Sequence, residues 1–110
     1  MRTRLCRLDE IADNDSNRFV AEIGGVRRGY LAVRQGTQVF VYGNSCPHIG
    51  SPLDFLPGKF LNAEKTHIQC STHGALFRIE DGYCISGPCA GKSLEPAAAE
   101  VRGGDVYLVE

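Results

Sequence analysis

The chain has 110 residues, 43% of them hydrophobic, which suits one soluble globular domain with a modest core and leaves no room for a separate catalytic domain. Its 12 basic and 13 acidic side chains give a net charge of -1 without a basic block, which argues against nucleic acid and anionic membranes as partners. The segment Met1–Glu10 has no apolar stretch long enough for a signal peptide or a membrane anchor, so a cytoplasmic location is expected.

Short alternating or apolar segments separated by glycine predict β-strands along the chain. The expected strands are residues 18–23, 31–33, 38–42, 75–79, 83–85, 99–101 and 106–109. Asp81-Gly82 and Gly103-Gly104 favour hairpin turns because glycine accepts positive φ. Pro96–Ala99 has some helical propensity, but its short length and its proline favour an extended segment. The pattern therefore predicts an antiparallel, all-β fold without internal repeats or linkers.

Two short segments, Cys46-Pro47-His48 and Cys70-Ser71-Thr72-His73, each offer one thiol and one imidazole. Thiolates and imidazoles are the side chains that hold iron-sulfur clusters, copper or zinc. A structural zinc site usually takes its ligands as a close Cys pair and a close His pair, or as four Cys. Here each segment supplies one of each, which suits a two-iron cluster with two thiolates on one iron and two imidazoles on the other. We therefore expect a metal centre held by Cys46, His48, Cys70 and His73.

The segments Cys46–Gly50 and Cys70–Phe77 resemble the two cluster-binding loops of the Rieske iron-sulfur family, and Ser86–Gly91 resembles the family's third, proline-bearing loop. The clear match runs over residues 46–94. The resemblance implies one 2Fe-2S cluster per chain, with two thiolates on the inner iron and two imidazoles on the outer iron. These ligands would be Cys46 and Cys70, then His48 and His73. It also implies a single domain over residues 1–110, an antiparallel sandwich or barrel-like fold with an inserted cluster-binding lobe at about residues 45–91.

The remaining cysteines and the third histidine are expected to have structural roles. Cys6 lies in the first apparent strand, where a core position is expected. Cys84 and Cys89 lie on either side of the proline loop, so a disulfide is conceivable, but free thiols are favoured in a reducing compartment. His67 lies in an alternating run that leads to Cys70 and is not expected to be a ligand.

Three positions depart from the respiratory members of the family. Ser51 and Ser71 stand where those members carry the cysteines of an inter-loop disulfide, so the chain is more similar to the soluble ferredoxins and oxygenase domains. Ala75 stands where high-potential members carry a serine hydroxyl. Hydrogen bonds to the sulfurs of the cluster raise its reduction potential. The absence of this hydroxyl therefore indicates a reduction potential at the low end of the range for Rieske centres.

Beyond the expected cluster, the sequence offers no second iron triad, no nucleophile-base pair and no nucleotide-binding glycine motif, so we expect a carrier and not an enzyme. A Rieske domain of this size resembles the ferredoxin component of bacterial ring-hydroxylating oxygenases. That resemblance implies transient partners: a flavin-containing, NAD(P)H-dependent reductase and a terminal oxygenase. Docking would use a small apolar tip around the two histidines. The tip residues would be Pro47, Ile49, Leu76 and Pro88.

Three other interpretations remain open from the residues. The chain could be a Rieske subunit held permanently in a larger oxidoreductase, such as an oxygenase or a nitrite-reductase-like assembly. It could be a structural zinc module for protein interaction, which would be colourless and redox-silent. It could also be a redox sensor that uses Cys84 and Cys89, which requires reversible thiol oxidation.

Overall fold

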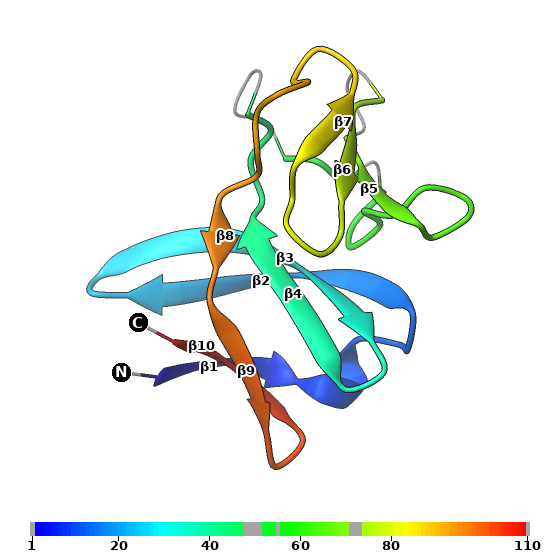
Figure 1. The fold of residues 1–110 in the computed structure, drawn as a ribbon. Helices are drawn as coiled ribbons and strands as arrows, with labels where there is room; N and C mark the ends of the chain where they lie inside the picture. The colour runs from blue at the N-terminus through cyan, green and yellow to red at the C-terminus, as the bar shows by residue number, and fades with distance from the viewer. Residues whose placement is uncertain (1, 48–51, 55, 71–73, 110) are drawn as a thin grey trace.

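The computed structural model describes residues 2–47, 52–54, 56–70 and 74–109. These residues form ten antiparallel strands and one short 3-10 helix, η1, and no α-helix is found among them, which confirms the expected all-β class (Figure 1). The elements are β1 (Arg2–Arg7), η1 (Leu8–Glu10), β2 (Asp15–Ile23), β3 (Val26–Gln35), β4 (Gln38–Gly43), β5 (His67–Gln69), β6 (Leu76–Arg78), β7 (Cys84–Ser86), β8 (Pro96–Ala97), β9 (Ala99–Arg102) and β10 (Asp105–Val109).

Two sheets form the base of the molecule. One has the order β2-β3-β4-β8 and the other the order β1-β10-β9. The sheets touch where β1 contacts β2 and where β4 contacts β9, so the base is barrel-like, as expected. The termini lie side by side because Arg2 pairs with Val109 (Figure 1). The side chains buried between the sheets are Cys6, Ile11, Ala21, Tyr30, Ala32, Val41, Val106 and Leu108.

Glycine turns and strand pairing explain where the base strands begin and end. The β2-β3 hairpin turns at Gly24 and Gly25, whose φ angles of 60° and 79° suit a tight turn that other residues enter only with strain. β3 is longer than the expected strand 31–33, because it pairs with β2 along its whole length and with β4 over its second half. Pro96 and Ala97 are extended and pair with β4, which confirms the extended segment expected there.

The third sheet, β5-β6-β7, forms a separate lobe above β4 and β8 (Figure 1). The three strands of the lobe lie between β4 and β8 in the chain, so the lobe is an insertion between two strands of the base. It has its own apolar core, which also takes in Leu31, Val33 and Tyr42 from the base. Side chains from both units therefore share one core, which holds the lobe on β3 and β4. In the described residues no helix is long and apolar enough to cross a membrane.

Candidate metal centre

The first loop of the expected centre leaves the base directly after β4. Cys46 is buried, with 2% of its surface exposed. The Asn44 side chain holds the two ends of the loop together, because its Oδ1 accepts a 2.9 Å hydrogen bond from the Leu53 backbone N–H. Cys46 therefore lies between the end of a paired strand and a hydrogen-bonded return of the chain.

The second loop connects β5 to β6. The Cys70 backbone N–H donates to the carbonyl oxygen of Ala75 at 2.8 Å, and the Gly74 N–H donates back to the carbonyl oxygen of Cys70 at 3.0 Å. Cys70 and Ala75 are both buried. These two hydrogen bonds hold Cys70 close to Gly74 and Ala75, and the Cys70 thiol belongs to the lobe core.

The third loop follows β7 and packs on the second. A Cβ added at Gly87, whose φ is 98°, would lie 2.8 Å from Ala75 Cα and 3.0 Å from Ala75 Cβ. No residue other than glycine can bring the backbone this close without a shift. Within the loop, the Lys92 N–H donates to the carbonyl oxygen of Cys89 at 2.8 Å. The loop is therefore held both internally and against the residues that follow Cys70.

Four thiols meet in this lobe core, those of Cys46, Cys70, Cys84 and Cys89. All four are free thiols in this structure. Cys84 Sγ donates to the carbonyl oxygen of Ser86 at 3.2 Å, whereas Cys89 Sγ lies 3.7 Å from Cys46 Sγ. The sequence does not predict this second contact, since nothing in the spacing of Cys46 and Cys89 indicates that the third loop brings its thiol to the thiol of the first loop.

Several of the expected site residues fall outside the part of the chain that the structure describes. They are His48, Ile49, Ser51, Ser71 and His73. Within the described ranges, no group of three or more His, Cys, Asp and Glu side chains is placed to hold a metal ion. The two described residues of the expected ligand set, Cys46 and Cys70, are free, buried thiols on two loops that share one core. Two such thiols suit the thiolate half of an iron-sulfur site.

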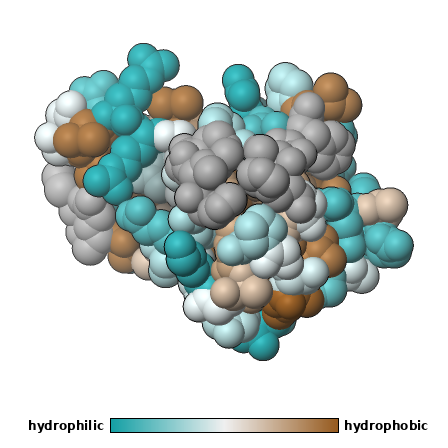
Figure 2. All heavy atoms as spheres, turned by 90° about the horizontal axis from the view of Figure 1, so that it is seen from above, coloured by the Kyte–Doolittle hydropathy of each residue, from teal (hydrophilic) through white to brown (hydrophobic). Residues whose placement is uncertain are grey.

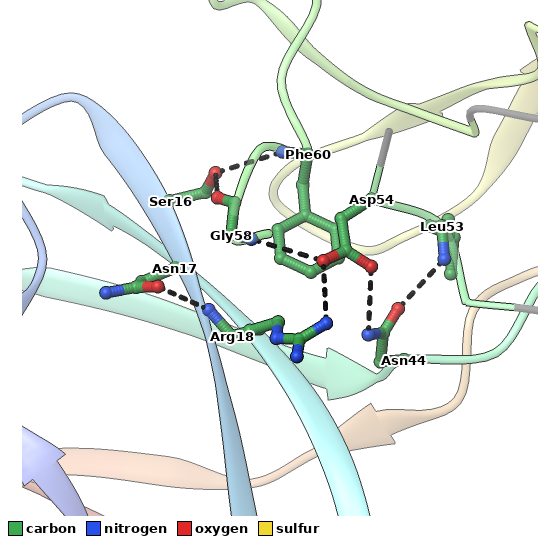
Figure 3. A network of polar contacts seen from close by, with 8 residues as sticks. All are labelled: Ser16, Asn17, Arg18, Asn44, Leu53, Asp54, Gly58 and Phe60. Carbon is green, nitrogen blue, oxygen red and sulfur yellow. Dashed lines mark hydrogen bonds and ion pairs between the residues drawn. The ribbon is translucent and has the colours of Figure 1, made fainter. Parts of the chain in front are cut away.

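A buried carboxylate joins the first loop to the base, and the sequence analysis did not single it out. The side chain of Asp54 is only 3% exposed. It accepts hydrogen bonds from the Gly58 backbone N–H at 3.1 Å, from Asn44 Nδ2 at 3.4 Å and from a guanidinium nitrogen of Arg18 at 3.4 Å (Figure 3). Asp54 thus ties the return of the first loop to β2 and to the end of β4.

A second contact extends this network along β2. The hydroxyl of Ser16 donates to the carbonyl oxygen of Gly58 at 2.9 Å and accepts from the Phe60 backbone N–H at 3.2 Å (Figure 3). Buried backbone groups that would otherwise lack partners are satisfied in this way. The segment that follows the first loop is therefore fastened to the base at two places, by Asp54 and by Ser16.

The turn between β6 and β7 is held by charge and by close packing. A hydrogen bond from the Arg78 guanidinium, with a further one from the Tyr83 N–H, lowers the pKa of Asp81. Arg78 Nε lies 3.0 Å from Asp81 Oδ1. In the same turn, a Cβ at Gly82 would lie 2.8 Å from the Tyr42 ring, so this hairpin fits closely against the end of β4.

Cys6 and His67 lie away from the expected centre. Cys6 is in the base core, where burial raises the pKa of its thiol to about 12 and keeps it unreactive at neutral pH. His67 is half-buried in β5, and its Nδ1 lies 3.0 Å from the hydroxyl of Thr66. Both observations agree with the structural roles expected for these residues.

The surface around the loops is mixed in polarity. Pro47 and Leu76 are half-buried, Pro88 is exposed, and Ile85 on β7 is 47% exposed. Figure 2 looks down on this end of the molecule, where hydrophobic and hydrophilic residues alternate around the atoms drawn in grey. The described residues of the expected apolar tip therefore expose only part of a surface that is both polar and apolar.

Comparison with known proteins identifies the family of this chain. A model of the Rieske [2Fe-2S] domain matches residues 2–103. A search of curated proteins found no match. Among solved structures, the ferredoxin of carbazole 1,9a-dioxygenase from Nocardioides aromaticivorans IC177 is similar, with a TM-score of 0.77 and 22% identity over 99% of this chain and 97% of that one.

Two further structures are similar. A chain in the complex of reduced oxygenase and oxidized ferredoxin in carbazole 1,9a-dioxygenase has a TM-score of 0.75 and 23% identity, over 98% of this chain and 92% of that one. The terminal oxygenase of carbazole 1,9a-dioxygenase from Novosphingobium sp. KA1 has a TM-score of 0.78 and 20% identity, over 97% of this chain and 29% of that one. These likenesses show the fold. Because the family model matches residues 2–103, nearly the whole chain, the chain belongs to the Rieske [2Fe-2S] domain family, whose members bind a 2Fe-2S cluster.

Proposed function

We propose that this protein is a soluble one-electron carrier and not an enzyme, with residues 1–110 acting as one Rieske domain. In this proposal Cys46 and Cys70 bind the inner iron, and His48 and His73 bind the outer iron. The observation that carries the proposal is the meeting of the free, buried thiols of the first two loops in one core, beneath a third loop that packs on Ala75. Membership of the Rieske family supports it.

The proposed ligands, two thiolates and two imidazoles, suit a centre that accepts one electron at a time. The bound cluster supplies one-electron redox chemistry, and in its oxidised form two ferric ions, two sulfides and two thiolates sum to zero charge when both imidazoles are neutral. Adding an electron is then less costly than in an all-thiolate cluster. The protein's part is to keep Cys46 and Cys70 away from water, which the burial of both residues supports.

We propose that the electron comes from a flavin-containing, NAD(P)H-dependent reductase and passes to a terminal ring-hydroxylating oxygenase. Two similar structures support the oxygenase as a partner: one is the ferredoxin of a carbazole dioxygenase, and the other is a complex of oxygenase with ferredoxin. The reductase rests on the family resemblance of the sequence. The chain also matches almost the full length of those two neighbours, but only 29% of the terminal oxygenase chain.

The first test is spectroscopic. Protein purified without oxygen should carry two irons and two sulfides per chain, give no electron paramagnetic resonance signal when oxidised, and give a Rieske-type signal after dithionite reduction. Cys46→Ser, Cys70→Ser, His48→Ala and His73→Ala should each lose that signal. His67→Ala and Cys84→Ala are matched controls that should keep it. A colourless wild-type protein that binds one zinc and cannot be reconstituted with iron and sulfide would refute the proposal.

A second test separates the carrier from a permanent subunit. Reduced protein should be reoxidised by a terminal ring-hydroxylating oxygenase in stopped-flow mixing, and rereduced by NAD(P)H only when a flavin reductase is added. The two proteins should run apart in gel filtration, because redox encounters bury little surface. A complex that stays together through purification would favour the permanent subunit and would contradict transient shuttling.

A further inference from the structure

We infer that Cys89 donates an S–H hydrogen bond to the sulfur of Cys46 and thereby raises the reduction potential of the centre. This inference rests on the proposed function, because it requires Cys46 to be a thiolate ligand. The Sγ atoms of the two residues are 3.7 Å apart. Cys89 is 1% exposed and Cys46 is 2% exposed, so water does not compete for either sulfur.

Metal binding decides which sulfur donates. Between two free thiols either could give the proton, but a thiolate that binds iron has no proton to give. Cys89 is then the only donor of the pair and Cys46 the only acceptor. When Cys46 binds iron, the contact between the two sulfurs is therefore a hydrogen bond from the Cys89 S–H to the Cys46 sulfur.

The backbone of the third loop fixes the Cys89 thiol in this place. The carbonyl oxygen of Cys89 accepts from the Lys92 N–H at 2.8 Å, and the Ala90 N–H donates to the carbonyl oxygen of Gly87 at 3.1 Å. Gly87 in turn packs against Ala75 of the second loop. The loop that carries the donor is therefore held by two backbone hydrogen bonds and by a close contact with the second loop.

The direction of the effect follows from charge. Reduction adds negative charge to the cluster and its ligand sulfurs, so a donor to one of those sulfurs stabilises the reduced form more than the oxidised form. A buried position strengthens the interaction, since little solvent screens it. Removal of the donor should shift the potential to a more negative value. A thiol is a weak donor, so the shift should be smaller than for a hydroxyl in the same geometry.

The test compares three variants with the wild type. Cys89→Ala removes the donor, Cys89→Ser keeps a donor at the same position, and Cys84→Ala removes a second buried thiol of the lobe that bonds to Ser86. Potentials are measured at one pH by titration monitored by electron paramagnetic resonance. We expect the reduction potential of Cys89→Ala to be more negative than that of wild type. The potential of Cys89→Ser should be higher than that of Cys89→Ala, and the potential of Cys84→Ala should equal that of wild type.

An isotope measurement on the wild type provides a readout that a structural role would not move. Transfer into D2O should shift the iron–thiolate bands in resonance Raman spectra, and Cys89→Ser should keep this sensitivity. In Cys89→Ala the part of the shift due to this hydrogen bond should disappear. If Cys89→Ala does not assemble a cluster, the comparison of wild type with Cys89→Ser decides the question. A thiol and a hydroxyl donor should give different deuterium shifts of the iron–thiolate bands, and equal shifts would overturn the inference.

Two outcomes would overturn the inference alone: a loaded Cys89→Ala protein at the wild-type potential, or an equal shift in Cys84→Ala. A wild-type protein without a 2Fe-2S centre would instead overturn the proposed function, and the inference with it. The iron, sulfide and spectroscopic assays on the wild type therefore distinguish the two failures.

Discussion

The hydroxyl of Tyr42 donates a 2.6 Å hydrogen bond to the carbonyl oxygen of Ile79. Tyr42 is on β4 of the base, and Ile79 follows β6 of the lobe, so this hydrogen bond joins the base to the lobe. Both residues are buried, and no water competes for the bond. The orientation of the lobe on the base therefore depends on a phenol as well as on the shared apolar core.

Replacement of Tyr42 by phenylalanine should lower the free energy of unfolding by about 1–3 kcal/mol, because the buried carbonyl oxygen of Ile79 loses its donor. Denaturant titration measures this loss. Tyr107→Phe is the control, since no hydrogen bond from its hydroxyl to another described residue is found. Equal losses in the two variants would contradict a special role for the Tyr42 contact.

The same phenol predicts a loss of stability at high pH. Burial, with smaller contributions from Asp81 and Glu80, raises the pKa of Tyr42 from 10.0 to about 12. A raised pKa favours the neutral form in the folded state, so the stabilisation is complete below pH 10 and is lost as the pH rises towards 12. The difference in unfolding free energy between wild type and Tyr42→Phe should shrink across this range. A constant difference would contradict the prediction.

Gly87→Ala should prevent the third loop from closing on the second. The added Cβ would lie 2.8 Å from Ala75 Cα, and backbone cannot move aside as a flexible side chain can. We expect a loss of most of the bound iron and sulfide per chain. Gly91→Ala is the matched control, because Gly91 also has a positive φ, of 90°, but has open space around it. It should lose only about 1–2 kcal/mol of stability through backbone strain and keep its iron. Equal iron loss in both variants would contradict the close-contact argument.

Asp54→Ala should loosen the first loop. It removes the acceptor of the Gly58 N–H and of the Asn44 side chain, which should lower the unfolding free energy by roughly 1–3 kcal/mol because two partly buried donors lose their partner. The iron-containing protein should also lose its metal faster to a chelator. Glu95→Ala is the control, since its pair with Arg28 is on the surface and should contribute less than about 1 kcal/mol. A chelation rate equal to that of wild type would show that Asp54 does not secure the loop.

Ala75→Ser should raise the reduction potential of the centre. Ala75 is fully buried in the second loop, and a hydroxyl there would add a donor beside the expected cluster. Voltammetry of protein with wild-type iron content measures the change. Ala90→Ser places the same hydroxyl on the exposed side of the third loop and should leave the potential unchanged. An unchanged or lower potential in Ala75→Ser would count against the argument.

Local patterns in the sequence were sufficient to predict several of the strands. Alternating residues and glycine turns predict β2, β4, β9 and β10 to within a few residues, because side-chain alternation and positive φ are properties of neighbouring residues. The buried thiols of Cys46 and Cys70 follow from the loop motifs in the same way. The family resemblance read from those motifs is confirmed by the match over residues 2–103.

Only the tertiary structure decided which distant groups meet. Cys46 and Cys89 are 43 positions apart, Tyr42 and Ile79 are 37 apart, and Arg18 and Asp54 are 36 apart. No local pattern encodes these contacts. The first depends on how two loops of the lobe pack on one another, and the other two depend on how the lobe packs on β2 and β4. A hydrogen bond needs its two atoms within a few tenths of an ångström of the right separation, and that precision comes from the packed core, which the composition of a segment cannot specify.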